Sequence, residues 1–105
     1  MQLPDYHQEE FARCVDEKFS VTGDPAGAFD IRLVDVNGRT NTPGQEIFAL
    51  LFHGPRAPYL PQGIHKLVNE RLGELDIFLV PVGQDSDGFQ YEAVFNRLVP
   101  PKQAG

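Results

Sequence analysis

Two histidines and an aspartate could together hold a metal ion. His53 and His65 flank a proline-rich segment, and with Asp76 they would form a site of two imidazoles and one carboxylate. Neither histidine belongs to a short ligand spacing, and a metal-bound imidazole needs further groups that orient it. We therefore interpret both histidines as surface residues at strand ends, and we predict no metal site.

The segment Asp85-Ser86-Asp87-Gly88 resembles the opening of a calcium-binding loop, in which alternate carboxylates bind the cation. The pattern is incomplete, because the twelfth loop position holds Asn96 where a glutamate is required. Asp-Gly is also a common pair at the tip of a hairpin. The segment therefore predicts a turn.

The sequence offers few nucleophiles. Its two serines, Ser20 and Ser86, lie outside a Gly-x-Ser-x-Gly elbow, and Cys14 lies on the apolar side of an expected helix, which is typical of a core residue. A phosphate-binding Gly-Lys-Ser or Gly-Lys-Thr triplet is absent. We predict no catalytic residue, no cofactor and no enzyme activity.

Length and composition predict a single domain over residues 1–105, with 41% hydrophobic residues. We divide it into an N-terminal helix region (1–18), a β-rich core (19–97) and a tail (98–105). The 10 glycines and 9 prolines recur along the chain and favour short strands over long helices.

Apolar residues at spacings of three and four predict one amphipathic helix, with Phe11, Cys14, Val15 and Phe19 on its apolar side. Alternation and turn residues predict about six strands, over residues 19–23, 29–36, 45–53, 64–68, 72–83 and 89–96. The connections are too short for crossover helices, so the strands should be mostly antiparallel. The predicted fold is α+β or mainly β, curled into a small barrel-like or half-open roll.

Three local features refine this prediction. The alternation shifts phase at Val34, which indicates a bulge, and Pro81 places its strand at a sheet edge or a bulge. Residues 45–53 are apolar on both faces, so the outer face should also be covered. We expect the polar loop 39–44 to be exposed and mobile.

Six segments, in this order, carry a resemblance to a family of small uncharacterised bacterial proteins that is known as a domain of unknown function: residues 48–52, 54–55, 60–63, 72–75, 78–83 (FLVPVG) and 91–96 (YEAVFN). The resemblance implies no activity. It does imply an association with phage-tail-like loci. The chain departs from the family pattern at His53 and His65, so neither histidine inherits a family role.

The charge balance limits the partners. With 15 acidic and 9 basic residues, the net charge of −6 disfavours nucleic acid and anionic membranes. A secretory signal and an apolar span are not seen, and the single cysteine cannot form an internal disulfide. We expect a cytoplasmic protein.

Two function classes remain. The first is a non-enzymatic protein-interaction or assembly module that binds another protein. Possible partner-binding residues are Arg56, Tyr59, Leu60, Phe78 and Val80. The alternative for the proline-rich loop is a stiff crossover that packs Tyr59 and Leu60 on the core. A homo-oligomer through a sheet edge belongs to this class. The second is a small-ligand-binding β domain that uses the interior or the mouth of the barrel.

Overall fold

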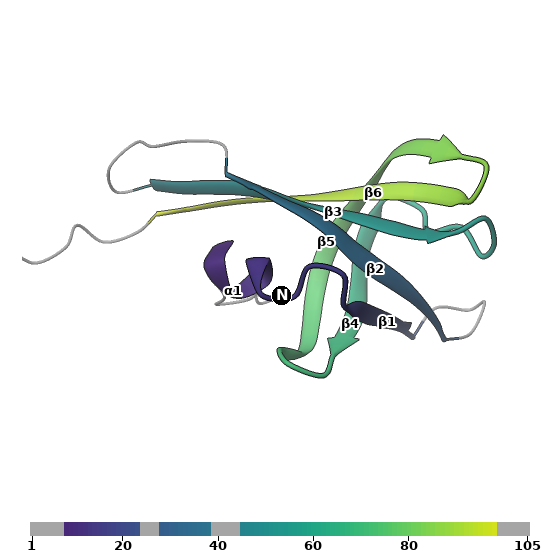
Figure 1. The fold of residues 1–105 in the computed structure, drawn as a ribbon, viewed down its shortest axis with the longest axis horizontal. Helices are drawn as coiled ribbons and strands as arrows, with labels where there is room; N and C mark the ends of the chain where they lie inside the picture. The colour runs from purple at the N-terminus through teal and green to yellow at the C-terminus, as the bar shows by residue number, and fades with distance from the viewer. Residues whose placement is uncertain (1–7, 24–27, 39–44, 99–105) are drawn as a thin grey trace, which may run out of the picture.

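The structure is a computed structural model that describes residues 8–23, 28–38 and 45–98. Its elements are α1 (Gln8–Ala12), β1 (Lys18–Thr22), β2 (Phe29–Gly38), β3 (Gln45–Pro55), β4 (Gly63–Asn69), β5 (Gly73–Asp85) and β6 (Gly88–Leu98). The sheet is antiparallel and closes into a barrel in the order β1-β2-β3-β6-β5-β4 (Figure 1). The predicted fold is therefore confirmed. The predicted loop 39–44 and all but the first residue of the predicted tail lie outside the described residues.

Alternate residues of every strand point into the barrel and form one apolar core. Phe48, Leu50 and Phe52 of β3 are fully buried, as is Tyr91 of β6, whose hydroxyl accepts the N–H of Leu60 at 3.0 Å. β6 also contributes Ala93 and Phe95, and the other strands contribute Phe19, Val21, Ile31, Leu33, Leu67, Leu75, Ile77 and Leu79. Side chains thus fill the described interior, as is usual for a barrel of so few strands.

The long β5–β6 hairpin agrees with the sequence pattern, and so do both predicted irregularities. The register shifts between Leu33 and Asp35 in β2, and again between Pro81 and Gly83 in β5. Pro81 therefore lies in a bulge, where a strand can accommodate a residue that has no N–H. At the hairpin tip, a Cβ on Gly88 would overlap the carbonyl of Gly54, so this close backbone approach requires glycine.

The helix α1 is shorter than predicted. It ends at Ala12, and Asp16 takes a positive φ of 73° so that its N–H reaches the carbonyl of Leu33 at 2.7 Å. Cys14 stays buried, but Val15 is 36% exposed and Phe19 belongs to β1. No helix of the described segments is long and apolar enough to cross a membrane.

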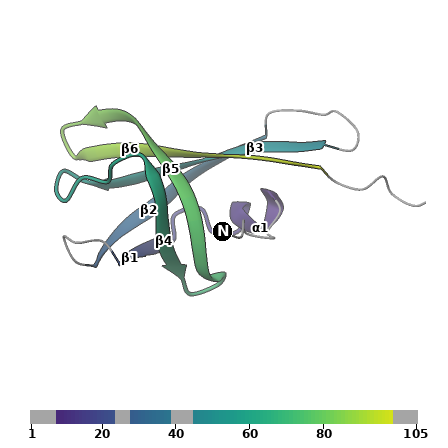
Figure 2. The same cartoon turned by 180° about the vertical axis from the view of Figure 1, so that it is seen from behind.

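We expected the outer face of β3 to be covered, but α1 packs on the opposite face. The helix lies in the angle between the β3–β6 pair and β5 (Figure 2), with the Phe11 ring 5.9 Å from Phe48 and 5.5 Å from Phe95. These partners are inward-facing residues, so α1 closes the inner side of the sheet. On the outer side, Ala49 is buried but Ile47 and Leu51 are only half-buried, so this face is covered only in part.

We predict that Phe11→Ala lowers the free energy of unfolding by about 3 to 5 kcal/mol, because it removes a fully buried ring from a cluster of three. Urea denaturation measures the change. The matched control is Phe78→Ala, which removes a ring that is 47% exposed and should cost less than about 1.5 kcal/mol. Equal losses in the two variants would contradict the position of Phe11.

Candidate functional site

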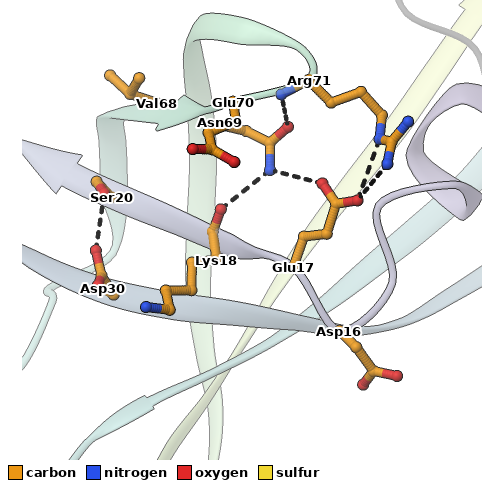
Figure 3. A pocket seen from close by; sticks show the side chains of 9 residues that line it. All are labelled: Asp16, Glu17, Lys18, Ser20, Asp30, Val68, Asn69, Glu70 and Arg71. Carbon is orange, nitrogen blue, oxygen red and sulfur yellow. Dashed lines mark hydrogen bonds and ion pairs between the residues drawn. The ribbon is translucent and has the colours of Figure 1, made fainter.

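A polar network lies where the end of β4 meets the start of β1, and its centre is Asn69, which is 2% exposed. The Asn69 amide donates to the carbonyl of Lys18 at 3.0 Å and to Oε1 of Glu17 at 3.3 Å (Figure 3). Its Oδ1 accepts the N–H groups of Arg71 at 2.9 Å and Leu72 at 3.0 Å. One buried side chain therefore joins two segments that are far apart in the sequence.

An ion pair extends this network toward solvent. Arg71 donates from Nε and Nη2 to Oε2 of Glu17, at 3.1 and 2.8 Å (Figure 3). The hydrogen bonds from Arg71, and then from Asn69, lower the pKa of Glu17. The Glu17 carboxylate is thereby held in its charged form.

Cys14 is next to the network and contacts Asn69. Its Sγ donates to the carbonyl of Glu10 at 3.6 Å and to Oδ1 of Asn69 at 3.9 Å. Burial raises the pKa of the Cys14 thiol, and the charge of Glu17 raises it further. These surroundings disfavour the reactive thiolate and suit a structural cysteine.

The network forms part of the lining of an open depression on the surface (Figure 3). The lining residues are Asp16, Glu17, Lys18, Ser20, Asp30, Val68, Asn69, Glu70 and Arg71. Ser20 donates to Oδ1 of Asp30 at 2.7 Å, and so pairs with a carboxylate rather than with the imidazole that activates a catalytic serine. Glu17, Asn69 and Arg71 bind one another, and Ser20 binds Asp30 (Figure 3), which is the arrangement of a structural network.

The two histidines have separate partners. Nε2 of His53 lies 3.3 Å from Oδ1 of Asp85, and Nε2 of His65 lies 2.8 Å from the carbonyl of Pro61. Asp76 is paired with Lys66 across the β4–β5 ladder. The strands β6 and β5 separate β3 from β4 in the sheet, so the arrangement of His53, His65 and Asp76 does not form. Within the described segments, no three metal-ligating side chains gather.

The segment from Asp85 to Gly88 forms the predicted turn. Oδ1 of Asp85 accepts the N–H groups of Asp87 at 2.8 Å and Gly88 at 2.9 Å. The hydrogen bond to His53, together with these backbone donors, lowers the pKa of Asp85. Asp85 would be the first ligand of a calcium loop, but its carboxylate instead accepts the hydrogen bonds that hold the hairpin tip.

The predicted partner-binding residues in the proline-rich loop between β3 and β4 differ in their exposure to solvent. Arg56 is exposed, and Tyr59 is 50% exposed, with its ring edge-on to Phe89 at 4.8 Å. Leu60 is fully buried, because its backbone is anchored to the hydroxyl of Tyr91. Leu60 is therefore not available to a partner, and we remove it from the predicted set.

The other predicted residues lie on the outside of the barrel. Phe78 is 47% exposed, and Val80 is half-buried on the same face of β5. The structure adds two residues that the sequence analysis missed: Val82, 51% exposed, and Ile64, 48% exposed and directly opposite Phe78 on β4. We call Ile64, Phe78, Val80 and Val82 the apolar stripe. The period of two from Phe78 to Val82 could have indicated three of its members.

Comparison with known proteins identifies one family. The family model described as "Domain of unknown function (DUF6916)" matches residues 6–95. No curated protein and no solved structure matches the chain.

We predict that Asn69→Ala destabilises the fold by about 3 kcal/mol, because it leaves buried backbone groups without their partner. Urea denaturation provides the measurement. Ser20→Ala, which removes a more exposed hydrogen bond in the same depression, is the control and should cost about 0.5 kcal/mol or less. A loss at Asn69 no larger than the loss at Ser20 would exclude a structural role for the network.

The lowered pKa of Glu17 predicts a pH dependence of stability. Its ion pair contributes fully above the unfolded pKa of a glutamate, about 4.3, and is lost as the pH falls through the lower folded value. Between pH 5 and pH 3, the urea midpoint of the wild type should therefore fall by more than that of Glu17→Gln. Parallel curves for the two proteins would show that the ion pair contributes nothing.

Proposed function

The chain belongs to this family of unknown function, and we propose that it is a non-enzymatic protein-interaction or assembly module. In this proposal, the apolar stripe of Ile64, Phe78, Val80 and Val82 binds another protein. The proposal includes a bacterial, cytoplasmic setting, in line with the single cysteine. It also includes an assembly role beside phage-tail-like proteins, which the family resemblance implies.

The observation that carries the proposal is the uneven outer face of the barrel. On β1 and β2 the outward residues are mostly polar, among them Lys18, Ser20, Asp30 and Arg32. On β5 three successive outward positions, Phe78 to Val82, are apolar, and Ile64 borders them. Contiguous exposed apolar residues that are framed by polar ones are typical of protein interfaces.

The outer side of β3 supports the same conclusion. Its residue Leu51 pairs with Glu92 of β6, and Glu92 pairs in turn with Val80 of the stripe. Leu51 and Ile47 give this side an apolar character that α1 does not cover, since α1 packs against Phe48 on the other side. A partner on the stripe could extend over this neighbouring surface and bury it.

Tyr59 and Arg56 would add to the interface at one end. Tyr59 contacts Phe89, and Phe89 pairs with Gln84 of β5, two residues beyond Val82. Tyrosine and arginine are enriched among residues that dominate binding energy. The closed sheet gives less support to a homo-oligomer through a sheet edge.

The small-ligand alternative has weaker support. A barrel that binds a ligand inside needs free interior volume, but the rings of Phe19, Phe48, Phe52 and Tyr91 are fully buried in this one. In the open depression beside Asn69, the lining residues Glu17, Asn69 and Arg71 already bind one another, and Ser20 binds Asp30.

We predict that Phe78→Ser lowers recovery of a partner from lysate of the native cell by about tenfold or more, since burying a phenylalanine contributes about 2 kcal/mol. Affinity capture with tagged protein, followed by quantitative mass spectrometry, measures this recovery. Val15→Ser is the matched control, because Val15 is 36% exposed and lies outside the stripe. Thermal melts would first establish that both variants are folded.

A protein recovered by the wild type and by Val15→Ser, but not by Phe78→Ser, supports the proposal. Recovery that is the same for all three proteins, or the absence of any protein captured above background, contradicts it.

A further inference from the structure

Acidic side chains border the apolar stripe along two strands. Asp76 and Glu74 occupy the outward positions of β5 that precede Phe78, at the alternate spacing that keeps them on the same face. Glu92 of β6 lies directly opposite Val80. Carboxylates therefore lie both beside the stripe and at one end of it.

One basic residue on this face is already balanced. Lys66 of β4 is paired with Asp76, and its Nζ lies 3.2 Å from Oε1 of Glu74. The hydrogen bond that Lys66 donates to Glu74, with the charges of Glu74 and Asp76, raises the pKa of Lys66. At the described outward positions of β4 and β5, the carboxylates of Glu74, Asp76 and Asp85 and the ammonium group of Lys66 leave a net charge of −2.

This charge argues against a second copy of the chain as the occupant. A two-fold dimer would place the same surface on both subunits, so each acidic border would face another acidic border. The whole chain carries a net charge of −6, which adds to the repulsion.

We infer that the partner is a different protein, whose docking segment presents apolar side chains flanked by lysine or arginine. This inference rests on the proposed function and specifies the chemistry of the partner. The apolar residues of that segment would cover Phe78, Val82 and Ile64. Its cations would lie against Glu74 and Asp76, which favours the correct orientation and speeds association at low salt.

Two synthetic amphipathic helices provide the test. Both have about 18 residues with leucine on one face, and the polar face carries lysine in one peptide and glutamate in the other. Binding to the full chain is followed by two-dimensional amide NMR, which gives both the affinity and the location. We expect the lysine peptide to shift the resonances of residues 64–68, 76–82 and 92–94, with an affinity about tenfold or more above that of the glutamate peptide.

Two charge-matched variants identify the carboxylates responsible. The variant Glu74→Gln with Asp76→Asn should reduce the preference for the lysine peptide to about threefold or less. The control, Glu9→Gln with Asp16→Asn, changes the net charge equally at exposed sites outside the stripe and should keep the preference. Asparagine is well tolerated at the positive φ of residue 16.

The outcomes distinguish the inference about charge from the proposed apolar docking surface. Equal affinity for the two peptides, or the same loss of preference in both variants, overturns the inference about charge but leaves an apolar docking surface in place. Failure of both peptides to bind, or shifts confined to β1 and β2, overturns the apolar stripe as a docking site and with it the proposed function.

Discussion

Closure of the sheet between β1 and β4 is the constraint on which the rest of the structure depends. Three register pairs form this seam: Ser20 with Val68, Val21 with Leu67, and Thr22 with Lys66. Asn69 extends the seam with its side chain, because its amide binds the carbonyl of Lys18 while its Oδ1 holds the turn that leads into β5. On the other side of this segment, Glu17 and Leu33 are joined by a backbone hydrogen bond of 3.1 Å. The polar groups that most resemble a site are thus used to fix β1 between its two neighbours.

Closure also determines what the barrel can present to other molecules. Because side chains alternate along a strand, closing the sheet turns Ile77 and Leu79 into the core and Phe78 and Val80 away from it. The interior is filled by aromatic rings, so recognition falls to the outside. There the apolar stripe on β4 and β5 lies among acidic side chains, whereas the outward residues of β1 and β2 are mostly polar. A rigid sheet face of this kind is well suited to a partner that brings its own apolar residues and basic groups.

Much of the fold could be predicted from local patterns, and what was missed depends on contacts between distant residues. Alternation and turn chemistry indicated the strands, the β5–β6 hairpin, and the bulges near Val34 and Pro81. The early end of the helix was not predictable, because it depends on pairing of Asp16 with Leu33 across the sheet. Whether Leu60 contacts a partner or packs on the core is left open by the sequence, since nothing local shows that its N–H reaches Tyr91. Ile64 was missed for a similar reason: its place in the stripe follows from the register that sets it opposite Phe78.

Closure of the barrel, and with it exposure of the apolar stripe, is tested most directly by measuring the solvent exposure of methyl groups in the free protein. The measurement uses relaxation enhancement from a soluble paramagnetic probe. Ile64 and Val82 should be strongly broadened, while Ile77 and Leu67 should be protected, because the closed barrel places the first pair outside and the second pair in the core. Similar broadening of all four, or stronger broadening of Ile77 and Leu67, would mean that the barrel is not closed in this register. In that case the apolar stripe would not be presented to a partner.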